Sequence, residues 1–289
     1  MSRYDIAIIG TGPAGISAAI TAKVRNKSLI LFGKKFSGGK VEKAHQVDNY
    51  LGIPSVSGSD LQKKFVEHAE QMGIEFTEQK VTMVMPIGDY FALQTSENEI
   101  VEAETVIIAS GMTAGRTYPG ENEYLGMGVS YCATCDAALY KGKKAAVIGF
   151  SPEEEKEADF LAEFASKVYY IPMYKGDANV REGIEVLREK PVRIEGDMQV
   201  RKLVTDAGEY EVDGVFILRP SIAPGQLVPG LEMDGSHIKT ARDMSTSYPG
   251  CYAAGDITGQ PYQLIKAAGE GNTAALSAVS YIDERRRKA

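Results

Sequence analysis

The fold is set by a stretch near the start of the chain, Asp5-Ile6-Ala7-Ile8-Ile9-Gly10-Thr11-Gly12-Pro13-Ala14-Gly15. Its first half is a β-branched apolar run, typical of a strand buried in a parallel sheet. Its second half has the spacing G-x-G-x-x-G and leads into a small-residue helix and a second strand over 28–32. These glycines allow a tight turn, close approach of a pyrophosphate and close helix–strand packing. The βαβ unit therefore predicts a dinucleotide site at the helix N-terminus.

A second stretch indicates which dinucleotide binds. The strand at 28–32 ends in Gly33-Lys34-Lys35, without the acidic residue that often holds a ribose. Farther along, Ala253-Ala254-Gly255-Asp256 is typical of a buried strand that leads into a helix. A carboxylate at that point can accept hydrogen bonds from the ribitol hydroxyls of a flavin. We therefore favour FAD, with a helix N-cap as the alternative role of Asp256.

The strand–glycine–helix pattern occurs twice. Its second copy begins at Lys144-Ala145-Ala146-Val147-Ile148-Gly149, which indicates an internal duplication of the fold. The tail after Ala241 holds only one strand and one long helix, too little for a third domain. We expect an α/β protein with two Rossmann-like domains of the FAD/NAD-linked reductase type, the second inserted in the first. The FAD domain is predicted to comprise 1–114 and 242–289, and the insertion 115–241.

The most reactive motif is Cys132-Ala133-Thr134-Cys135-Asp136. Two thiols at this spacing can close a disulfide, and a helix that begins there lowers a thiol pKa and favours the thiolate nucleophile. Asp136 is placed to move the proton of a leaving thiolate. A metal site would need two more ligands, and the remaining Cys251 and the histidines show no such spacing, so no metal is expected. Inert structural cysteines are the other alternative, and they are the preferred interpretation for Cys251.

Composition narrows the function classes. The 289 residues include 39 acidic and 32 basic side chains, for a net charge of −7, which argues against a broad nucleic-acid-binding surface. No apolar run approaches the roughly 18 residues that span a membrane. The strand pattern begins directly after residues 1–5, which leaves no room for a signal peptide, so a cytoplasmic protein is expected.

Together, these motifs resemble those of the low-molecular-weight thioredoxin reductases over nearly the whole chain. The resemblance is carried by Gly10–Gly15, Gly38-Gly39, Val47-Asp48-Asn49-Tyr50, Ile108–Gly111, Cys132–Asp136 and Gly255-Asp256. It implies a homodimeric oxidoreductase in which Cys132 attacks thioredoxin, Cys135 faces the flavin and Asp136 is the acid–base residue. The FAD-binding positions that it implies are Gly10, Gly12, Pro13, Ala14, Gly15, Lys34, Gly39, Asn49, Ala109, Gly111, Gly255 and Asp256.

The chain departs from the family pattern at the second glycine loop. Where a pyrophosphate loop needs G-x-G-x-x-A, this chain has Gly149-Phe150-Ser151-Pro152-Glu153-Glu154. The side chains of Phe150 and Ser151 stand where a phosphate should meet bare backbone. Glu153, Glu154 and Glu155 suit the helix dipole but would repel a pyrophosphate.

Two further departures concern the cofactors. The family places His-Arg-Arg and another Arg after the next strand to bind the 2′-phosphate of NADPH, but this chain has Pro172–Ala178 with only Lys175 there. No NADPH site is therefore expected. Near the last helix the family has Arg-Gln-Ala, where this chain has Gln263-Leu264-Ile265, so flavin contacts there must differ.

An intact dithiol motif without a hydride-donor site resembles the ferredoxin-dependent flavin thioredoxin reductases. The resemblance implies that ferredoxin reduces FAD in two steps, FAD reduces the Cys132–Cys135 disulfide, and the dithiol reduces thioredoxin. Because ferredoxins are generally acidic, a locally basic docking site is expected. The candidates are the cluster Lys34, Lys35, Lys40 and Lys43 and the C-terminal run Arg285–Lys288, each of which can instead be an ordinary solvated surface.

Two other functions use the same residues. An FAD-dependent dithiol oxidase would run the chemistry backwards, forming a disulfide in a small substrate and passing electrons to O₂. A non-enzymatic flavoprotein could act as a redox sensor or binding module, although retention of Cys132, Cys135 and Asp136 counts against it. The direction of electron flow would distinguish the reductase from the oxidase.

Overall fold

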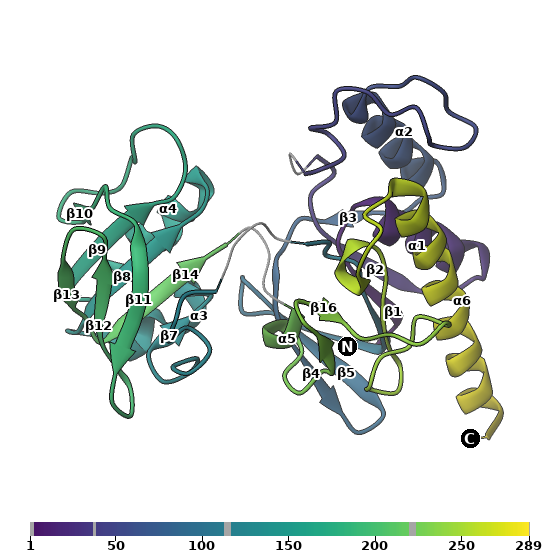
Figure 1. Cartoon of the computed structure of the whole chain (residues 1–289). Helices are drawn as coiled ribbons and strands as arrows, with labels where there is room; N and C mark the ends of the chain where they lie inside the picture. The colour runs from purple at the N-terminus through teal and green to yellow at the C-terminus, as the bar shows by residue number, and fades with distance from the viewer. Residues whose placement is uncertain (1–2, 37–38, 113–116, 220–223, 289) are drawn as a thin grey trace. The chain divides into compact units, whose positions relative to one another are not determined.

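The computed structural model describes residues 3–36, 39–112, 117–219 and 224–288. Two compact units divide the chain (Figure 1). Unit 1 combines Met1–Thr95, Glu99–Met112 and Ala223–Ala289, and unit 2 combines Ser96–Asn98 and Thr113–Ile222. The chain thus returns to unit 1 at residue 223, whereas the sequence analysis expected the return at 242. The reason lies in 224–241, where α5 (Pro224–Leu227) packs against β4 (Val81–Ile87) and β16 (His237–Ile238) of unit 1.

Unit 1 is built around the predicted βαβ unit. The strands β1 (Tyr4–Ile9) and β2 (Leu29–Phe32) pair in parallel and are joined by α1 (Pro13–Val24). Small side chains let α1 approach α6 (Leu264–Lys288) closely, since a Cβ on Gly271 would lie 2.0 Å from the Ala14 carbonyl oxygen. The buried faces of α1 and α6 belong to one apolar core with the sheet.

The sheet of unit 1 has seven strands in the order β3-β2-β1-β6-β5-β4, with β17 (Cys251–Ala253) also paired to β6. The strands β3 (Phe76–Thr77), β2, β1, β6 (Ile100–Ile108) and β17 run parallel. The N-terminal half of β6 instead continues into an antiparallel meander with β5 (Tyr90–Thr95) and β4. The helix α2 (Gly58–Gln71) packs near α1, with Ser57 as its N-cap.

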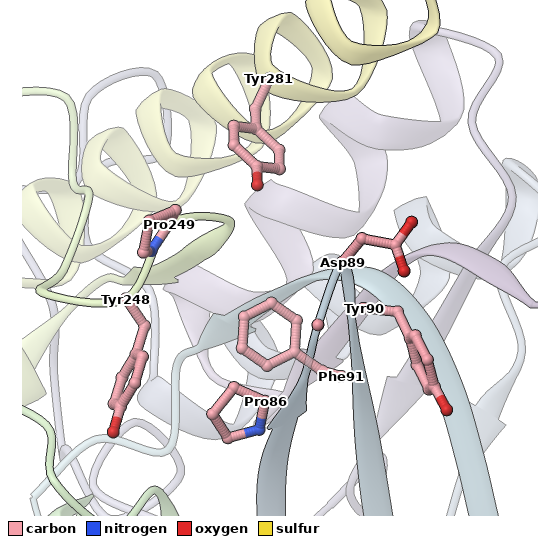
Figure 2. A pocket seen from close by; sticks show the side chains of 8 residues that line it. Pro86, Asp89, Tyr90, Phe91, Tyr248, Pro249 and Tyr281 are labelled. Carbon is pink, nitrogen blue, oxygen red and sulfur yellow. The ribbon is translucent and has the colours of Figure 1, made fainter. Parts of the chain in front are cut away.

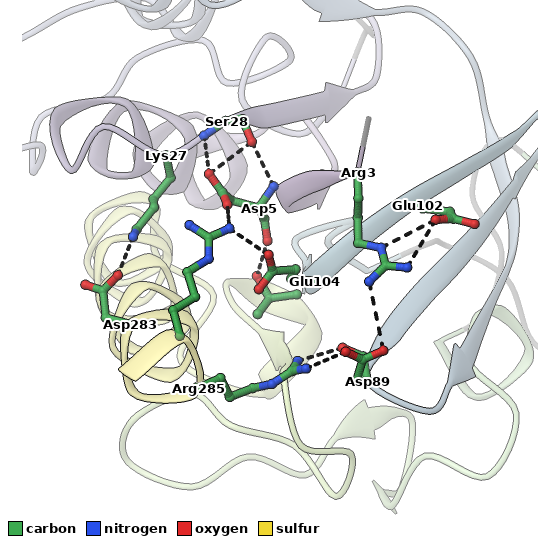
Figure 3. A network of polar contacts seen from close by, with 11 residues as sticks. Arg3, Asp5, Lys27, Ser28, Asp89, Glu102, Glu104, Asp283 and Arg285 are labelled. Atoms are coloured by element: carbon green, nitrogen blue, oxygen red, sulfur yellow. Dashed lines mark hydrogen bonds and ion pairs between the residues drawn. The ribbon is translucent and has the colours of Figure 1, made fainter. Parts of the chain in front are cut away.

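An ion-pair network fastens the C-terminal half of α6 to the amino edge of this sheet (Figure 3). Arg286 pairs with Asp5 and lies 2.6 Å from a carboxylate oxygen of Glu104. Arg285 pairs with Asp89 at 2.8 Å, and Lys27 pairs with Asp283. Two residues of the predicted C-terminal basic run, Arg285 and Arg286, thus form ion pairs within unit 1.

Unit 2 repeats the same plan in a shorter form. Its parallel sheet has the order β10-β9-β8-β14-β7, built from β10 (Glu185–Val186), β9 (Lys167–Pro172), β8 (Lys144–Gly149), β14 (Gly214–Leu218) and β7 (Val129–Ser130). The helix α4 (Glu155–Leu161) follows β8 after a 3₁₀ turn over Pro152–Glu154. An antiparallel sheet of β11 (Pro191–Gly196), β12 (Val200–Thr205) and β13 (Glu209–Glu211) connects β10 to β14.

The predicted fold class, two Rossmann-like α/β units, is confirmed. Among the described residues, none of the helices has the length and apolar character needed to cross a membrane. The same residues contain no cluster of three or more His, Cys, Asp or Glu side chains able to hold a metal ion.

Candidate active site

The predicted glycine loop lies at the carboxyl edge of the unit 1 sheet. The ends of β1 and β6 are joined there, because Ala109 N donates a hydrogen bond to Ile9 O at 2.8 Å. Gly10 has φ +117°, and a Cβ on it would lie 2.3 Å from the Ala109 carbonyl oxygen. A Cβ on Gly15 would lie 1.8 Å from the Gly10 carbonyl oxygen. Both positions therefore need glycine for the close approach of helix and strands.

The start of α1 offers open donors for a phosphate. Gly12 is the N-cap without a side-chain hydrogen bond, Pro13 follows, and the first turn holds no acidic residue. A Cβ on Gly12 would meet nothing within 4 Å. Beside this turn, the buried Oγ of Ser110 has no hydrogen-bond partner among the described residues, and Gly111 follows with φ +66°. Free N–H groups and an orphaned hydroxyl fit the pyrophosphate end of FAD.

Asp256 lies at the same edge, after β17. Gly255 has φ +91°, and a Cβ on it would lie 3.0 Å from the Cβ of Ala14, so α1 and this turn are in contact. Lys40 Nζ donates to the Asp256 carboxylate at 3.0 Å and lies 5.0 Å from the centre of the Tyr262 ring. The N-cap of the turn over Asp256–Thr258 is Gly255, so the capping role considered for Asp256 is not seen.

A buried glutamine anchors the loop that carries Lys34. Thr11 Oγ1 donates to the Lys34 carbonyl oxygen at 2.6 Å. Gln62 Nε2 donates to the carbonyl oxygens of Thr11 at 3.3 Å and Lys35 at 3.0 Å. Gln62 is not among the residues predicted from the sequence, although a glutamine beside the buried Leu61 on a predicted helix face is a detectable signal.

The loop between β2 and α2 contacts the start of α6. Asn49 Nδ2 donates to Gln263 Oε1 at 2.9 Å, and Gly39 N donates to Glu42 Oε1 at 3.3 Å. Gly38, the first glycine of the quoted pair, lies outside the described residues. Lys40 therefore contacts one predicted FAD-binding residue, Asp256, and Gln62 supports the backbone around another, Lys34.

The cysteine motif lies in unit 2, between β7 and β8. Cys132 is disulfide-bonded and mostly buried, with 6% of its surface exposed. The helix α3 (Ala133–Asp136) follows directly, and Cys132 Sγ lies 3.4 Å from Thr134 Oγ1. The side chain of Cys135 lies outside what the structure describes.

Carboxylates surround this motif. Ala133 N donates to Glu157 Oε2 of α4 at 2.7 Å. Burial, followed by the charges of Asp136 and Asp213, raises the pKa of Tyr140 to about 12. The third cysteine is different in kind: Cys251 is a free thiol on β17, and complete burial raises its pKa to about 12. Cys251 therefore stays protonated and inert, as the sequence indicated.

Side chains of unit 2 lie against both ends of the second glycine loop. A Cβ on Gly149 would lie 2.3 Å from the Tyr170 hydroxyl, which in turn lies 3.2 Å from the Tyr174 hydroxyl. Glu155 accepts hydrogen bonds from the Tyr174 hydroxyl and from Asn179 N, the latter at 3.1 Å. These contacts tie the segment after β9 to the start of α4, where a dinucleotide phosphate would need open backbone.

A buried ion pair stands at the end of β14, beside the same loop. Arg219 makes a bidentate contact with Glu121, and its guanidinium lies 5.2 Å from the Phe150 ring centre and 5.6 Å from that of Tyr118. Tyr131, the residue before Cys132, donates from its hydroxyl to Glu121 at 3.1 Å. In Rossmann-like folds this edge, between the central strands, is where the ligand binds. The residues present here do not fit a nicotinamide dinucleotide.

One small cavity lies elsewhere. Its volume is about 120 Å³, and it lies between the β4–β5 turn and α6 with mostly proline and aromatic side chains around it. Phe91 on β5 and Tyr281 on α6 point toward this cavity (Figure 2). Phe91 pairs with Ala103, which also pairs with Tyr4 at the amino end of β1. The cavity is therefore at the opposite edge of the sheet from the glycine loop and does not belong to the candidate site.

Comparison with known proteins agrees with this geometry. The pyridine nucleotide-disulphide oxidoreductase family model matches residues 4–271. A thioredoxin reductase of Aquifex aeolicus is 35% identical over an alignment of 307 positions, gaps included, which covers 98% of this chain and 95% of that protein. The crystal structure of a ferredoxin-flavin thioredoxin reductase from Clostridium acetobutylicum superposes with a TM-score of 0.90 and 53% identity, covering 99% of both chains. A thioredoxin reductase from Gloeobacter violaceus has a TM-score of 0.80 and 30% identity, covering 98% of this chain and 95% of that one.

Proposed function

Because this chain belongs to the pyridine nucleotide-disulphide oxidoreductase family, we propose that it is a flavin-dependent thioredoxin reductase that takes its electrons from reduced ferredoxin. The observation that carries the proposal is the contrast between the two units. The first turn of α1 in unit 1 holds no acidic residue and a Cβ on Gly12 would meet nothing within 4 Å, while the matching turn of unit 2 carries Glu153 and Glu154. These carboxylates disfavour the pyrophosphate of a nicotinamide dinucleotide, the usual hydride donor, whereas the disulfide motif is retained.

In unit 1 the proposed cofactor is FAD. The N–H groups at Gly12 and the following turn hold its pyrophosphate, and Asp256 accepts hydrogen bonds from its ribitol hydroxyls. The remaining proposed contacts are Gly10, Pro13, Ala14, Gly15, Lys34, Gly39, Asn49, Ala109, Gly111 and Gly255. Bound FAD would accept electrons one at a time from ferredoxin and deliver them as a pair to a disulfide.

In unit 2 the proposed catalytic residues are Cys132, Cys135 and Asp136. Reduction breaks the Cys132–Cys135 disulfide with two electrons, and the Cys132 thiolate then attacks the disulfide of thioredoxin. Asp136 moves the proton that the leaving thiolate requires. By the same family resemblance, we propose a cytoplasmic homodimer.

Anaerobic spectroscopy of the purified FAD-loaded protein tests the donor. Reduced ferredoxin should bleach the flavin band, while NADPH and NADH should leave it oxidised over the same period. Rapid bleaching by NADPH would refute ferredoxin dependence. Electron flow tests the direction: thioredoxin disulfide should be reduced by the ferredoxin-reduced enzyme. Oxygen consumption and peroxide with a small dithiol, without thioredoxin reduction, would instead identify a dithiol oxidase.

A further inference from the structure

We propose that Glu157 is a positioning residue for the redox disulfide. The negative charge of Glu157 makes that disulfide harder to reduce and its dithiol a stronger reductant. This rests on the proposed function, in which Cys132 and Cys135 form the redox disulfide. The acidic start of α4 thereby has a second role, beyond opposing a pyrophosphate.

The contact is short and comes from a different element. Glu157 lies in the first turn of α4, which packs against α3, and its Oε2 accepts a hydrogen bond from Ala133 N at 2.7 Å. Ala133 is fully buried and directly follows Cys132. On the other side, Ser130 Oγ lies 3.2 Å from Cys132 N. The backbone around Cys132 is therefore fixed from both directions.

The contact also changes the electrostatics of the thiolate. In a Cys-x-x-Cys motif that opens a helix, N–H groups of the first turn stabilise the thiolate. Here the Ala133 N–H is already donated to a carboxylate, which adds negative charge one residue from Cys132. Most charged groups on the elements around α4 are acidic as well. The acidic groups are Asp136 on α3, Glu153 and Glu154 in the 3₁₀ turn, and Glu155 and Asp159 on α4. The basic groups are Lys156 on α4, Lys167 on β9 and Arg181, which donates to Asp159.

The redox consequence follows from charge. Reduction of the disulfide takes up two electrons from the flavin and breaks the sulfur–sulfur bond. Uptake of one proton leaves one thiol and one thiolate, the Cys132 sulfur that attacks thioredoxin. The disulfide is uncharged, so the Glu157 carboxylate penalises only the reduced form. The midpoint potential is therefore lower with Glu157 than it would be without its charge.

Three variants separate charge from positioning. Glu157→Gln keeps an amide oxygen that can accept from Ala133 N but removes the charge. Glu157→Asp keeps the charge, and Glu163→Gln removes an exposed carboxylate at the end of the same helix region, where it pairs with Arg181 at 3.6 Å. Each FAD-loaded protein is equilibrated anaerobically with dithiol–disulfide buffers of known potential, and the free thiols are counted.

Glu157→Gln should shift the equilibrium about tenfold toward the dithiol, a midpoint about 30 mV higher. Glu163→Gln should match the wild type, and Glu157→Asp should stay closer to the wild type than Glu157→Gln. An unshifted Glu157→Gln midpoint, or an equal shift in Glu163→Gln, would overturn the proposal. The titration needs neither ferredoxin nor thioredoxin. A wild-type enzyme that fails to transfer electrons between them would refute the proposed function while leaving the midpoint measurable.

Discussion

The Arg219 guanidinium contacts both carboxylate oxygens of Glu121, at 2.6 and 2.9 Å, although 98 residues separate the two along the chain. Both side chains are buried, with 8% and 0% of their surface exposed. Burial alone would lower the pKa of Arg219, but the hydrogen bonds and charge of Glu121 outweigh it and the pKa is raised. The pair replaces an open ligand edge with a fixed internal contact, and it also holds Tyr131 next to Cys132.

Breaking this pair should destabilise unit 2. Arg219→Met leaves a buried carboxylate without its cation, and such a loss costs about 3–5 kcal/mol. Adding Glu121→Gln should recover part of that loss, because a neutral amide needs no cation and its one oxygen can still accept from either Tyr118 N or the Tyr131 hydroxyl, which bond different oxygens of Glu121. Hydrogen exchange of unit 2 amides in urea measures the change. As a control, Arg188→Met, in an exposed pair with Asp177, should stay within about 1 kcal/mol. A small effect of Arg219→Met would mean that the pair adds little to stability.

Lowering the pH should weaken the ion pair between Asp5 and Arg286 that attaches α6 to the sheet. Burial alone would raise the pKa of Asp5, but hydrogen bonds from Ser28 and the neighbouring Arg286 lower it overall. Its stabilising contribution is therefore fully present above the ordinary Asp pKa near 4, and it is lost as the pH falls through the lower folded value. Asp5→Asn should reduce stability at neutral pH and flatten the acid side of a plot of melting temperature against pH. Asp234→Asn, at an exposed position, should leave that slope unchanged.

The elements that the sequence predicted are those whose signals are local. Each Rossmann-like start combines a β-branched run with a glycine and a helix within about fifteen residues, so Asp5–Gly15 and Lys144–Gly149 were recognisable. The departures at Phe150, Ser151 and Glu153–Glu155 were equally local. They predict that unit 2 has no dinucleotide site, and in the structure Tyr170, Tyr174 and Glu155 contact one another beside that loop.

The remaining features depend on tertiary contacts. The antiparallel sheet of β11, β12 and β13 has charged residues in every strand and no clean alternation, so its pattern did not stand out. The return to unit 1 at 223 depends on α5, a helix too short to show a period. Likewise, the contact of Lys40 with Asp256 joins residues 216 positions apart, which a single sequence cannot pair.

The two candidate ferredoxin-docking sites now differ in what a mutation would disturb. Arg285 and Arg286 hold α6 in place, so only Arg287→Glu with Lys288→Glu tests the C-terminal run without breaking those ion pairs. On the loop after β2, Lys35 pairs with Glu70 at 2.7 Å, Lys40 pairs with Asp256 at 3.0 Å and Lys34 is a proposed FAD contact, so Lys43→Glu is the loop variant.

We expect the loop variant to slow electron transfer from ferredoxin about five- to tenfold at low salt and to flatten its salt dependence, because charge complementarity acts mainly on the association rate. The C-terminal variant should behave as the wild type. Stopped-flow reduction of the flavin at several ionic strengths measures both. The reverse pattern would indicate that ferredoxin docks at the end of α6. No change in either variant would rule out both surfaces as the docking site.

Gly12 offers the sharpest test of where the FAD pyrophosphate binds. Its backbone is extended, with φ −77° and ψ −175°, and a Cβ there would meet no protein atom within 4 Å. Gly12→Ala should therefore fold with a stability within about 1 kcal/mol of the wild type. The added methyl group nevertheless lies where the motif lets the pyrophosphate approach the backbone, so FAD affinity should fall at least about tenfold. Calorimetric titration of the apoprotein with FAD measures this loss.

Gly15→Ala serves as the contrasting variant, because its Cβ would lie 1.8 Å from the Gly10 carbonyl oxygen and should disrupt folding itself. Unchanged FAD affinity in a folded Gly12→Ala protein would place the cofactor phosphates away from the start of α1.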